Sequence, residues 1–500
     1  MFAYDQLPYS GAVEAETHPR YLEAVAMLRG IQPASLDGCR VLELGCAAGK
    51  TLLQLAEEFP TSQFIGVDLA RGRIDEAKAI ASEVGLKNVE FCQGSLTEVD
   101  ETWGEFDYIL CIGVLSWVPS EVQDQIFRVI RESLTAQGVA AVTYKTFPGW
   151  HHLNIVRDAM RYHTDKSHDP PDRIRDARKT LELFARETQA NSVQGRIYRD
   201  EHKFLGNAQD DYLFHDYLTD ASYPLYFHEF YRRATEHDLK YVGETNFARN
   251  NLPPDATTSR TAMADLPLVE RCQMLDFLNN TAYRKSILCR GDVEMSESID
   301  PAKLKTMRLS LREIPTPSNF EIGSSDVLTF KYESGSLGVA APFGKAALRH
   351  LIDVYPRPVS ISELCDGANS LLPPTAQHLR VDRDRGQDLI ASAMLGSLEA
   401  GLIQVCVRPP EFVQTISDRP AASPLACALA KRTAIVANRC HQNVSLSNDA
   451  ALILSHLDGR DDREQLKQQL VSSPDETRRT PEQRLDLALT ELNNRAFLVK

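Results

Sequence analysis

The stretch ELGCAAGKT, residues 43–51, follows an apolar run and combines two glycines with a Gly-Lys-Thr triplet. Such a loop could hold either the phosphates of a nucleotide or a different ligand. A phosphate-binding loop needs four residues between its first glycine and its Gly-Lys pair, but only three separate Gly45 from Gly49. One missing residue spoils the nest of backbone amides around a phosphate. We therefore interpret Lys50 as a solvated residue at the start of a helix.

The chain around this loop alternates apolar strands with amphipathic helices. The predicted strands are CRVLELG at 39–45, SQFIGVDL at 62–69, NVEFCQGSL at 88–96, FDYILCIGV at 106–114 and GVAAVTY at 138–144. The helices between them are KTLLQLAEEF at 50–59, RGRIDEAKAIASEVG at 71–85 and SEVQDQIFRVIRESL at 120–134. This alternation is typical of an α/β fold with a parallel sheet covered on both faces. Ligands bind at the carboxyl ends of such strands, where the loop at 43–51 lies.

Two carboxylates at these strand ends indicate the ligand. Glu43 would repel a pyrophosphate, but it would attract a ligand that carries an ammonium and a sulfonium, as S-adenosylmethionine does. Asp68 ends the second strand, nineteen residues after Gly49, where a carboxylate can accept hydrogen bonds from both ribose hydroxyls. The dinucleotide pattern fits poorly, because Ala47 replaces one of its glycines. The residues therefore predict a site for S-adenosylmethionine.

Residues 39–145 resemble the class I S-adenosylmethionine-dependent methyltransferases, with ELGCAAG as the glycine loop and GVDL as the ribose strand. The resemblance implies a Rossmann-like sheet. It also implies that residues at the ends of the first four strands bind the cofactor: Glu43, Gly45, Cys46, Ala47, Gly49, Asp68, Leu69, Gly94, Ser95, Leu96, Gly113 and Val114. Among them, the residues at 94–96 would lie beside the adenine, and those at 113–114 would form the bottom of the pocket around the methionine part of the cofactor.

Two later segments predict the strands that close the sheet, FHEFYRRATEHDLKYVGETNF at 227–247 and FLNNTAYRKSILCR at 277–290. The predicted cofactor domain therefore comprises residues 31–150 and 223–295, and a helix-patterned insertion at 151–222 interrupts it. Three helices and a strand then follow, and a similar order occurs once more, which predicts a winged-helix-like middle domain at 296–410 and a similar C-terminal domain at 411–500.

A wider resemblance rests on YDQLPYSGAVEAETHPRYL at 4–22, GVLSWVP at 113–119, TYKTFPGWH at 143–151 and HQNVSLSNDAALILSHLDGRDDREQL at 441–466. These segments resemble bacterial methyltransferases that carry a regulatory domain, a group that includes rickettsial lysine methyltransferases of outer-membrane proteins. The resemblance implies a homodimer formed through the insertion and an N-terminal segment, residues 1–30, that covers the substrate and cofactor. It also implies methyl transfer to lysine side chains of envelope proteins.

Aromatic residues near the strand ends are the catalytic candidates, because aromatic faces attract a methyl-bearing nitrogen. They are Trp117, Tyr144, Tyr4 and Tyr9, with Trp150 beyond them. The alternative for each is ordinary packing. A base or metal pair could come from His151, His215, His228 and Glu229, but no two of these histidines have the helical spacing of zinc ligands. We therefore interpret them as structural and expect no metal.

The composition limits the remaining possibilities. A formal net charge of −14 and the lack of a basic block argue against nucleic acid as the main partner. No apolar run is long enough to span a bilayer, and the start of the chain lacks a secretory signal pattern. The ten scattered cysteines form no C-x-x-C pair, as in a reduced cytoplasmic protein. Two alternatives to a protein methyltransferase stay open: a small-molecule N-, O- or C-methyltransferase, and a non-catalytic scaffold that binds the cofactor.

Overall fold

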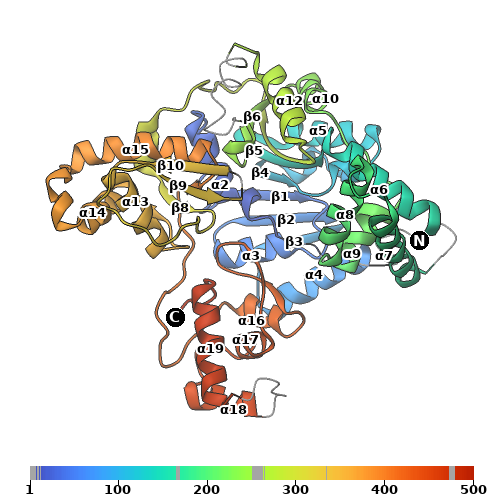
Figure 1. Ribbon diagram of the computed structural model, residues 1–500. Coiled ribbons are helices and arrows are strands. Elements are labelled where there is room, and N and C mark those ends of the chain that lie inside the picture. The colour runs from blue at the N-terminus through green and yellow to red at the C-terminus, as the bar shows by residue number, and fades with distance from the viewer. Residues whose placement is uncertain are drawn as a thin grey trace.

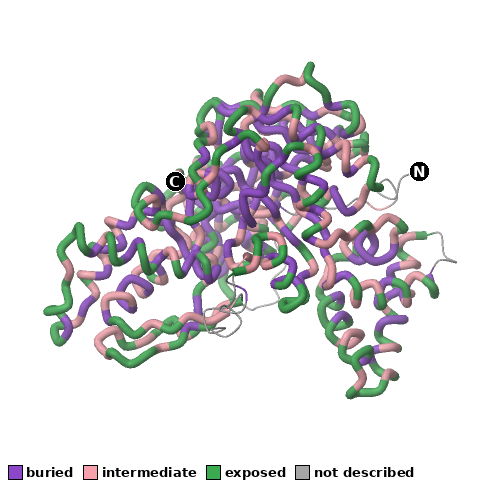
Figure 2. The backbone as a smooth tube through the Cα atoms, turned by 90° about the horizontal axis from the view of Figure 1, so that it is seen from above, coloured by how far each residue is buried: buried purple, intermediate pink, exposed green. Residues whose placement is uncertain are grey.

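The computed structural model describes residues 7, 11, 13–164, 169–250, 263, 265–333, 335–471 and 479–500. A large sheet lies at the centre, with a bundle of helices on one side of it and a mixed module on the other (Figure 1). A second small module lies below the sheet and contains the C-terminus (Figure 1). The tube coloured by burial shows that buried residues concentrate in the central part, whereas the outlying modules mix exposed and intermediate residues with smaller buried cores (Figure 2).

The central sheet has seven strands in the order β3-β2-β1-β4-β5-β7-β6. The strands are β1 (Arg40–Leu44), β2 (Gln63–Asp68), β3 (Val89–Gln93), β4 (Phe106–Cys111), β5 (Leu134–Lys145), β6 (Leu239–Glu244) and β7 (Tyr283–Arg290). Strands β1 to β5 pair in parallel, and β7 pairs antiparallel to both β5 and β6. The strand order reverses beside β1, and this is the position at which such sheets bind ligands. The predicted α/β, Rossmann-like sheet is confirmed.

Helices cover both faces of this sheet. They are α2 (Pro19–Leu28), α3 (Lys50–Glu58) and α4 (Arg71–Glu83) on one face, and α5 (Ser120–Ser133), α10 (Phe227–Glu236) and α12 (Leu268–Asn279) on the other. Neighbouring strand residues point to opposite faces, so Val41 joins the first core and Leu42 the second. Each face thus has its own apolar core, as the continuous apolar runs predict.

The segment between β5 and α10 forms a helical module with a separate apolar core. Its elements are α6 (Gly149–Thr164), α7 (Pro170–Glu187), α8 (Val193–Gly206), α9 (Asp210–Leu213) and the π-helix η5 (Phe214–Leu218). Helix α6 starts at a position that only glycine fits, because a Cβ on Gly149 would lie 2.5 Å from the Cα of Ala282. This close approach fixes the module against the sheet.

The middle module contains a three-stranded sheet, a hairpin and three α-helices. Its elements are η7 (Pro301–Thr306), β8 (Arg308–Leu311), β9 (Leu328–Tyr332), β10 (Gly335–Val339), α13 (Pro342–Asp353), β11 (Val359–Ser360), α14 (Ile361–Leu371), η8 (Pro374–Leu379), α15 (Arg383–Glu399) and β12 (Ile403–Cys406). The sheet has the order β11-β8-β12, and β9 pairs with β10.

The C-terminal module is smaller and follows an irregular linker. Its elements are α16 (Pro424–Ala430), β13 (Ile435–Ala437), β14 (Asn443–Ser445), α17 (Asn448–Leu454), α18 (Arg463–Val471) and α19 (Pro481–Asn494). The remaining short 3-10 helices are η1 (Ala15–Thr17), η2 (Leu96–Glu98), η3 (Glu101–Trp103), η4 (Leu115–Trp117) and η6 (Phe247–Asn250). Helix α16 packs against α3 and α4, so the C-terminal module is attached to the cofactor domain.

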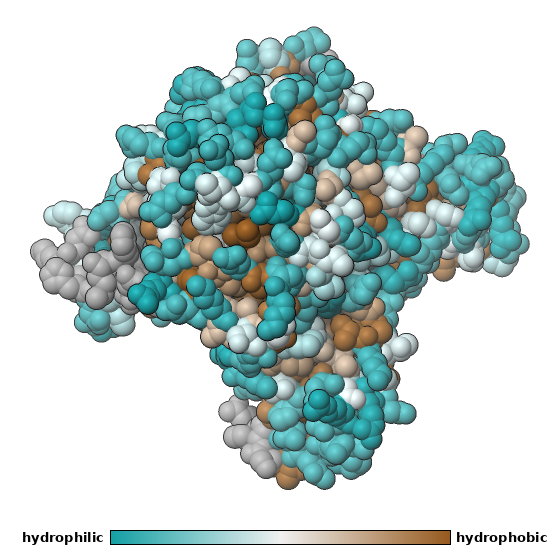
Figure 3. Space-filling view, turned by 180° about the vertical axis from the view of Figure 1, so that it is seen from behind, coloured by the Kyte–Doolittle hydropathy of each residue, from teal (hydrophilic) through white to brown (hydrophobic). Residues whose placement is uncertain are grey.

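Seen from behind, the surface is mostly hydrophilic, with apolar side chains gathered in the middle of the molecule (Figure 3). Within the described residues, none of the helices is long and apolar enough to cross a membrane. All ten cysteines are free, and eight of them are buried. The cysteines therefore serve as core residues, as the sequence predicts.

Candidate active site

The glycine loop between β1 and α3 adopts a conformation that few residue types tolerate. Gly45, Ala47 and Gly49 have φ angles of 77°, 47° and 68°, in the left-handed region. A Cβ on Gly45 would lie 2.4 Å from Cγ2 of Val114, and a Cβ on Gly49 would lie 2.3 Å from the ring of Phe91. The loop thus packs against the ends of β3 and β4, and its backbone can approach a ligand closely.

Two carboxyl groups flank this loop. Glu43 is 5% exposed. Its Oε2 atom is buried and accepts no hydrogen bond from the residues that the structure describes. Burial raises the pKa of Glu43 to about 8, while a hydrogen bond with Thr51 opposes the shift. A buried acceptor without a partner fits a cationic ligand group, and the ammonium of S-adenosylmethionine is such a group.

Asp68 shapes the loop from the end of β2. Its Oδ2 accepts a hydrogen bond from the backbone N–H of Ala47 at 2.9 Å, and its Oδ1 accepts one from Ala70 at 2.8 Å. Each carboxylate oxygen keeps a further lone pair for a hydroxyl donor. Leu69, which follows Asp68, is 53% exposed and forms open surface beside the loop.

The other predicted cofactor residues lie at the neighbouring strand ends. The backbone N–H of Gly94 donates to the carbonyl of Asp68 at 3.0 Å, and Gly113 donates to Oγ1 of Thr143 at 2.7 Å. Ser95 caps the short helix η2, which begins with the buried Leu96. Together with Cys46 and Val114, these residues surround one edge of the sheet at the point where the strand order reverses. The structure therefore brings the predicted cofactor residues together.

The interpretation of Lys50 as a solvated residue was wrong. Its side chain is half-buried, and Nζ donates a hydrogen bond to the carbonyl of Gly11 at 3.0 Å. Burial lowers the pKa of this lysine. The nearby segment 13–17 continues across the sheet edge, where Glu16 forms ion pairs with Lys285 and with Arg312 of the middle module. Lys50 thus binds the N-terminal segment to the glycine loop.

An aromatic cluster lies next to the loop that follows β4. Trp117 ends η4, and its backbone N–H donates to the carbonyl of Val114 at 2.8 Å. The ammonium nitrogen of Lys145 lies 3.8 Å from the ring centroid of Trp117 and 3.9 Å from that of Trp150. The same nitrogen lies 3.1 Å from Oδ1 of Asp216. Sequence reasoning identified both tryptophans but missed Lys145 and Asp216, although TYKTFPGWH contains the lysine.

The structure does not bring the predicted Tyr144 to this cluster. Tyr144 is 2% exposed and stacks on Phe230, with ring centroids 4.2 Å apart. As the strand neighbour of Lys145, it points to the opposite face of the sheet. Burial raises its pKa well above the usual value. Tyr4 and Tyr9 lie outside the described residues.

The histidines considered as ligands or bases each have a local partner. His151 Nε2 lies 2.8 Å from the hydroxyl of Tyr226, His215 Nε2 lies 2.7 Å from the carbonyl of Leu7, and His228 Nδ1 lies 2.9 Å from Oε1 of Gln273. Glu229 caps α10 by accepting from the backbone N–H of Tyr226 at 2.8 Å. Among the residues that the structure describes, no group of three His, Cys, Asp or Glu side chains is placed to hold a metal.

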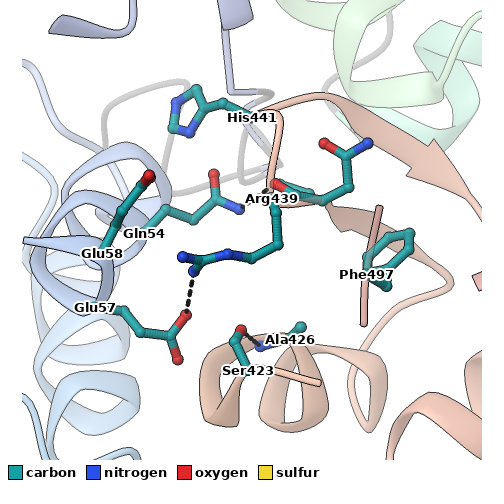
Figure 4. Close-up of a pocket in the computed structure, with 10 residues that line it drawn as sticks. Gln54, Glu57, Glu58, Ser423, Ala426, Arg439, His441 and Phe497 are labelled. Carbon is teal, nitrogen blue, oxygen red and sulfur yellow. Dashed lines mark hydrogen bonds and ion pairs between the residues drawn. The ribbon is translucent and has the colours of Figure 1, made fainter. Parts of the chain in front are cut away.

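A separate small cavity lies between α3 and the C-terminal module. Arg439 reaches across it toward Glu57 of α3 (Figure 4), and the two charged groups are 3.8 Å apart. The cavity has a volume of about 10 Å³, which is room for one water molecule and too little for a cofactor. This junction therefore joins two modules, and the ligand site lies at the carboxyl ends of the strands.

The sheet, the glycine loop and the two carboxyl groups define the class of S-adenosylmethionine-dependent methyltransferases. Comparison with known families agrees. A family described as "Methyltransferase domain" matches residues 35–191, a "Predicted methyltransferase regulatory domain" matches 209–290, and a "PKMT, C-terminal winged helix domain" matches 418–496.

Whole-chain relatives identify the particular family. The uncharacterized protein RP789 of Rickettsia prowazekii is 31% identical over 473 residues, which span 92% of this chain and 84% of the relative. The structure of PKMT2 from Rickettsia typhi superposes with a TM-score of 0.87 at 25% identity, over 99% of this chain and 100% of the other. A second structure of PKMT2, in complex with AdoHcy, gives a TM-score of 0.85 at 26% identity. The chain belongs to this family of methyltransferases with a regulatory domain and a PKMT-type winged helix, and its cofactor is S-adenosylmethionine.

Proposed function

We propose that the protein transfers methyl groups to lysine ε-amines of proteins, and that its substrates are proteins bound for the cell envelope. One observation carries the proposal. An indole ring, Trp117, stands in the loop after β4, one turn from the Val114 that packs against the glycine loop. An aromatic face at this place can line a methyl-bearing nitrogen. The names of the structural relatives and of the winged-helix family support a protein substrate.

The residues have separable roles in this reaction. Bound S-adenosylmethionine supplies an electrophilic methyl group, which a neutral amine attacks in line with the sulfonium. Glu43 faces the cationic methionine end, and Asp68 holds the loop and accepts from the ribose hydroxyls. Trp117 shields the acceptor amine from water and lowers the cost of its growing positive charge. The amine must arrive without its proton, and a desolvated site favours that state.

The same proposal includes the predicted division of the chain. Residues 1–30 cover the site, residues 31–150 with 223–295 bind the cofactor, and residues 151–222 form the contact of a homodimer. Residues 296–410 and 411–500 are two winged-helix-like domains that contact protein. Net charge supports a protein partner over nucleic acid, because a chain with a formal charge of −14 repels phosphates. We place the enzyme in the bacterial cytoplasm.

Transfer of radiolabelled methyl groups into a bacterial lysate tests the proposal. After incubation with the protein and labelled S-adenosylmethionine, the lysate is separated into protein, nucleic acid and small molecules. The proposal predicts label in the protein fraction. Label in small molecules would favour a metabolite methyltransferase, and cofactor binding without transfer to any fraction would favour a scaffold.

A further inference from the structure

The ammonium of Lys145 is a buried charge that the proposed reaction does not use. This residue ends β5, is 2% exposed, and lies beside the proposed acceptor loop. Its backbone N–H donates to Oγ of Ser116 at 2.7 Å, and the carbonyl of Ser116 accepts from Tyr223 at 2.8 Å. The strand end is therefore joined to η4, the short helix that presents Trp117.

Three groups from three different elements surround the ammonium. Trp117 of η4 and Trp150 of α6 cover it with their ring faces, at 3.8 Å and 3.9 Å from Nζ to the centroids. Asp216 of the π-helix η5 lies 3.1 Å away, and the Tyr283 hydroxyl donates to the same Oδ1 atom at 3.2 Å. A π-helix is a rare element that frequently marks functional sites.

Stability alone is a weak explanation for this arrangement. A buried ion pair loses much of its Coulomb energy to desolvation, and apolar residues of similar volume often stabilise a protein as well. The arrangement nevertheless holds two indoles in place: Trp150 is fully buried, whereas Trp117 is half-buried and keeps part of its surface open. The ammonium occupies the inner face of that ring. An incoming amine can then use only the outer side of Trp117.

We propose that Lys145 is a positioning residue for the acceptor amine: with Asp216 it fixes the ring of Trp117 and couples the helical module to the active site. This inference rests on the proposed amine methylation.

The charges around Lys145 determine how the contacts of its ammonium respond to pH. Burial lowers the pKa of Lys145 to about 8, Asp216 opposes this shift, and Arg157 of α6 adds to it. The tyrosines Tyr212 and Tyr283, which lie near Asp216, stay neutral because burial raises their pKa values. As pH rises through about 8, Lys145 therefore loses its proton and its cation–π contacts with both rings weaken.

We call the cluster of Lys145, Trp117, Trp150 and Asp216 the cage. Tryptophan fluorescence tests whether it exists, and the measurement needs no methyl acceptor. The chain has three tryptophans, so the variant Trp103→Phe reports on Trp117 and Trp150 alone. We expect its emission to change between pH 7 and pH 9 with a midpoint near 8. The same variant with Lys145→Met should show no such transition. Equal titration curves for the two proteins would contradict the cage.

Methyl transfer to a denatured envelope-protein extract tests the positioning role. Lys145→Met should lower the initial rate at limiting extract by at least about tenfold, with unchanged affinity for S-adenosylhomocysteine, and Lys145→Arg should recover part of the rate. Lys345→Met is the matched control, because among the described residues that buried lysine donates only to carbonyls of the middle module, at 2.7 Å. A wild-type rate in Lys145→Met would overturn the proposal.

Two further results keep the inference separate from the function on which it rests. If Lys145→Met does not fold, Asp216→Asn keeps the volume and removes only the charge, and we expect the same loss of rate at limiting extract. A wild-type protein that methylates no lysine contradicts the proposed function. The fluorescence titration then still decides whether the cage itself exists.

Discussion

At the scale of single residues, the sequence predicted which side chains lie beside the glycine loop, and it predicted the aromatic cluster after β4 only in part. Glu43 and Asp68 could be predicted because each combines a carboxylate with a fixed place at the end of an apolar strand. Lys145 could not, because a lysine in a sequence is ordinarily an exposed residue. Its partner Asp216 is 71 residues further along the chain, the difference between the two residue numbers. The contact of Lys50 with Gly11 could not be predicted from the sequence either, since only the fold brings the two residues together.

The protonation of Glu43 should couple cofactor binding to pH. The group is mostly protonated below its pKa of about 8, and a cationic ligand favours the carboxylate. Affinity for S-adenosylmethionine should therefore rise as pH rises from 6 to 7.5, by up to about tenfold per pH unit. Calorimetry of the wild type and of Glu43→Gln checks this, because the variant removes this titration but keeps that of the cofactor amine. Parallel pH dependences in the two proteins would contradict the assignment of Glu43.

Removal of the Asp68 carboxylate, which we expect to bind the ribose, should weaken cofactor binding. Asp68→Ala loses a charged acceptor for two hydroxyls as well as the hydrogen bond to Ala47, so we expect a loss of roughly 2–3 kcal/mol in binding. Trp117→Ala should leave this affinity nearly unchanged and slow transfer instead. Titration calorimetry and initial rates separate the two effects. If both variants lose affinity alike, Trp117 belongs to the cofactor pocket.

At the scale of elements, the apolar runs predicted every strand of the cofactor sheet, because strands buried on both faces have a strong pattern. The boundaries of the strands were harder to predict. Strand β5 begins at Leu134, whereas the apolar pattern began only at Gly138, since the residues between them are partly or fully exposed and the pairing with β4 is irregular there. The sequence of the π-helix η5 does not by itself predict this kind of helix, because the helix depends on tertiary packing around Asp216.

The left-handed start of α3 should be the most sensitive element of the site. Gly49→Ala places a Cβ 2.3 Å from the ring of Phe91 at a positive φ angle. We expect a loss of roughly 2 kcal/mol or more in the free energy of unfolding, with impaired cofactor binding. Gly72→Ala in α4 is the matched control, because its Cβ would meet nothing within 4 Å. Chemical denaturation compares them, and equal stabilities would refute this account of the loop.

At the scale of the whole molecule, sequence predicted the order of the modules and left their arrangement open. The N-terminal segment contacts the end of the chain, since the backbone N–H of Val13 donates to Oδ1 of Asn443 at 3.2 Å. Nearby, the rings of His18 and His441 meet edge to face with centroids 4.8 Å apart, and both are buried. Neither polar contact has a local sequence signal, because each joins residues from opposite ends of the chain.

This histidine pair should make the junction sensitive to acid. Burial lowers the pKa of His18 to about 4 and that of His441 well below its usual value. The unfolded chain therefore binds more protons as pH falls below 6.5, and the folded state should lose roughly 3 kcal/mol by pH 4.5 from His18 alone. His441→Asn keeps a residue that tolerates the left-handed φ of 60° and should reduce this loss. Denaturant titrations at pH 7.5 and pH 4.5 check it. An unchanged pH dependence in the variant would contradict this explanation.

The central claim is that the methyl group reaches a lysine nitrogen of a protein. The most direct measurement is mass spectrometry of peptides from an envelope-protein extract treated with the enzyme and deuterated S-adenosylmethionine, with Trp117→Ala as the comparison. We predict deuterated methyl groups on lysine side chains, strongly reduced in the variant and more abundant as pH rises from 7 toward 8, where more of the acceptor amine is neutral. Deuterated methyl groups confined to glutamate or glutamine, or absent from all peptides, would contradict the account.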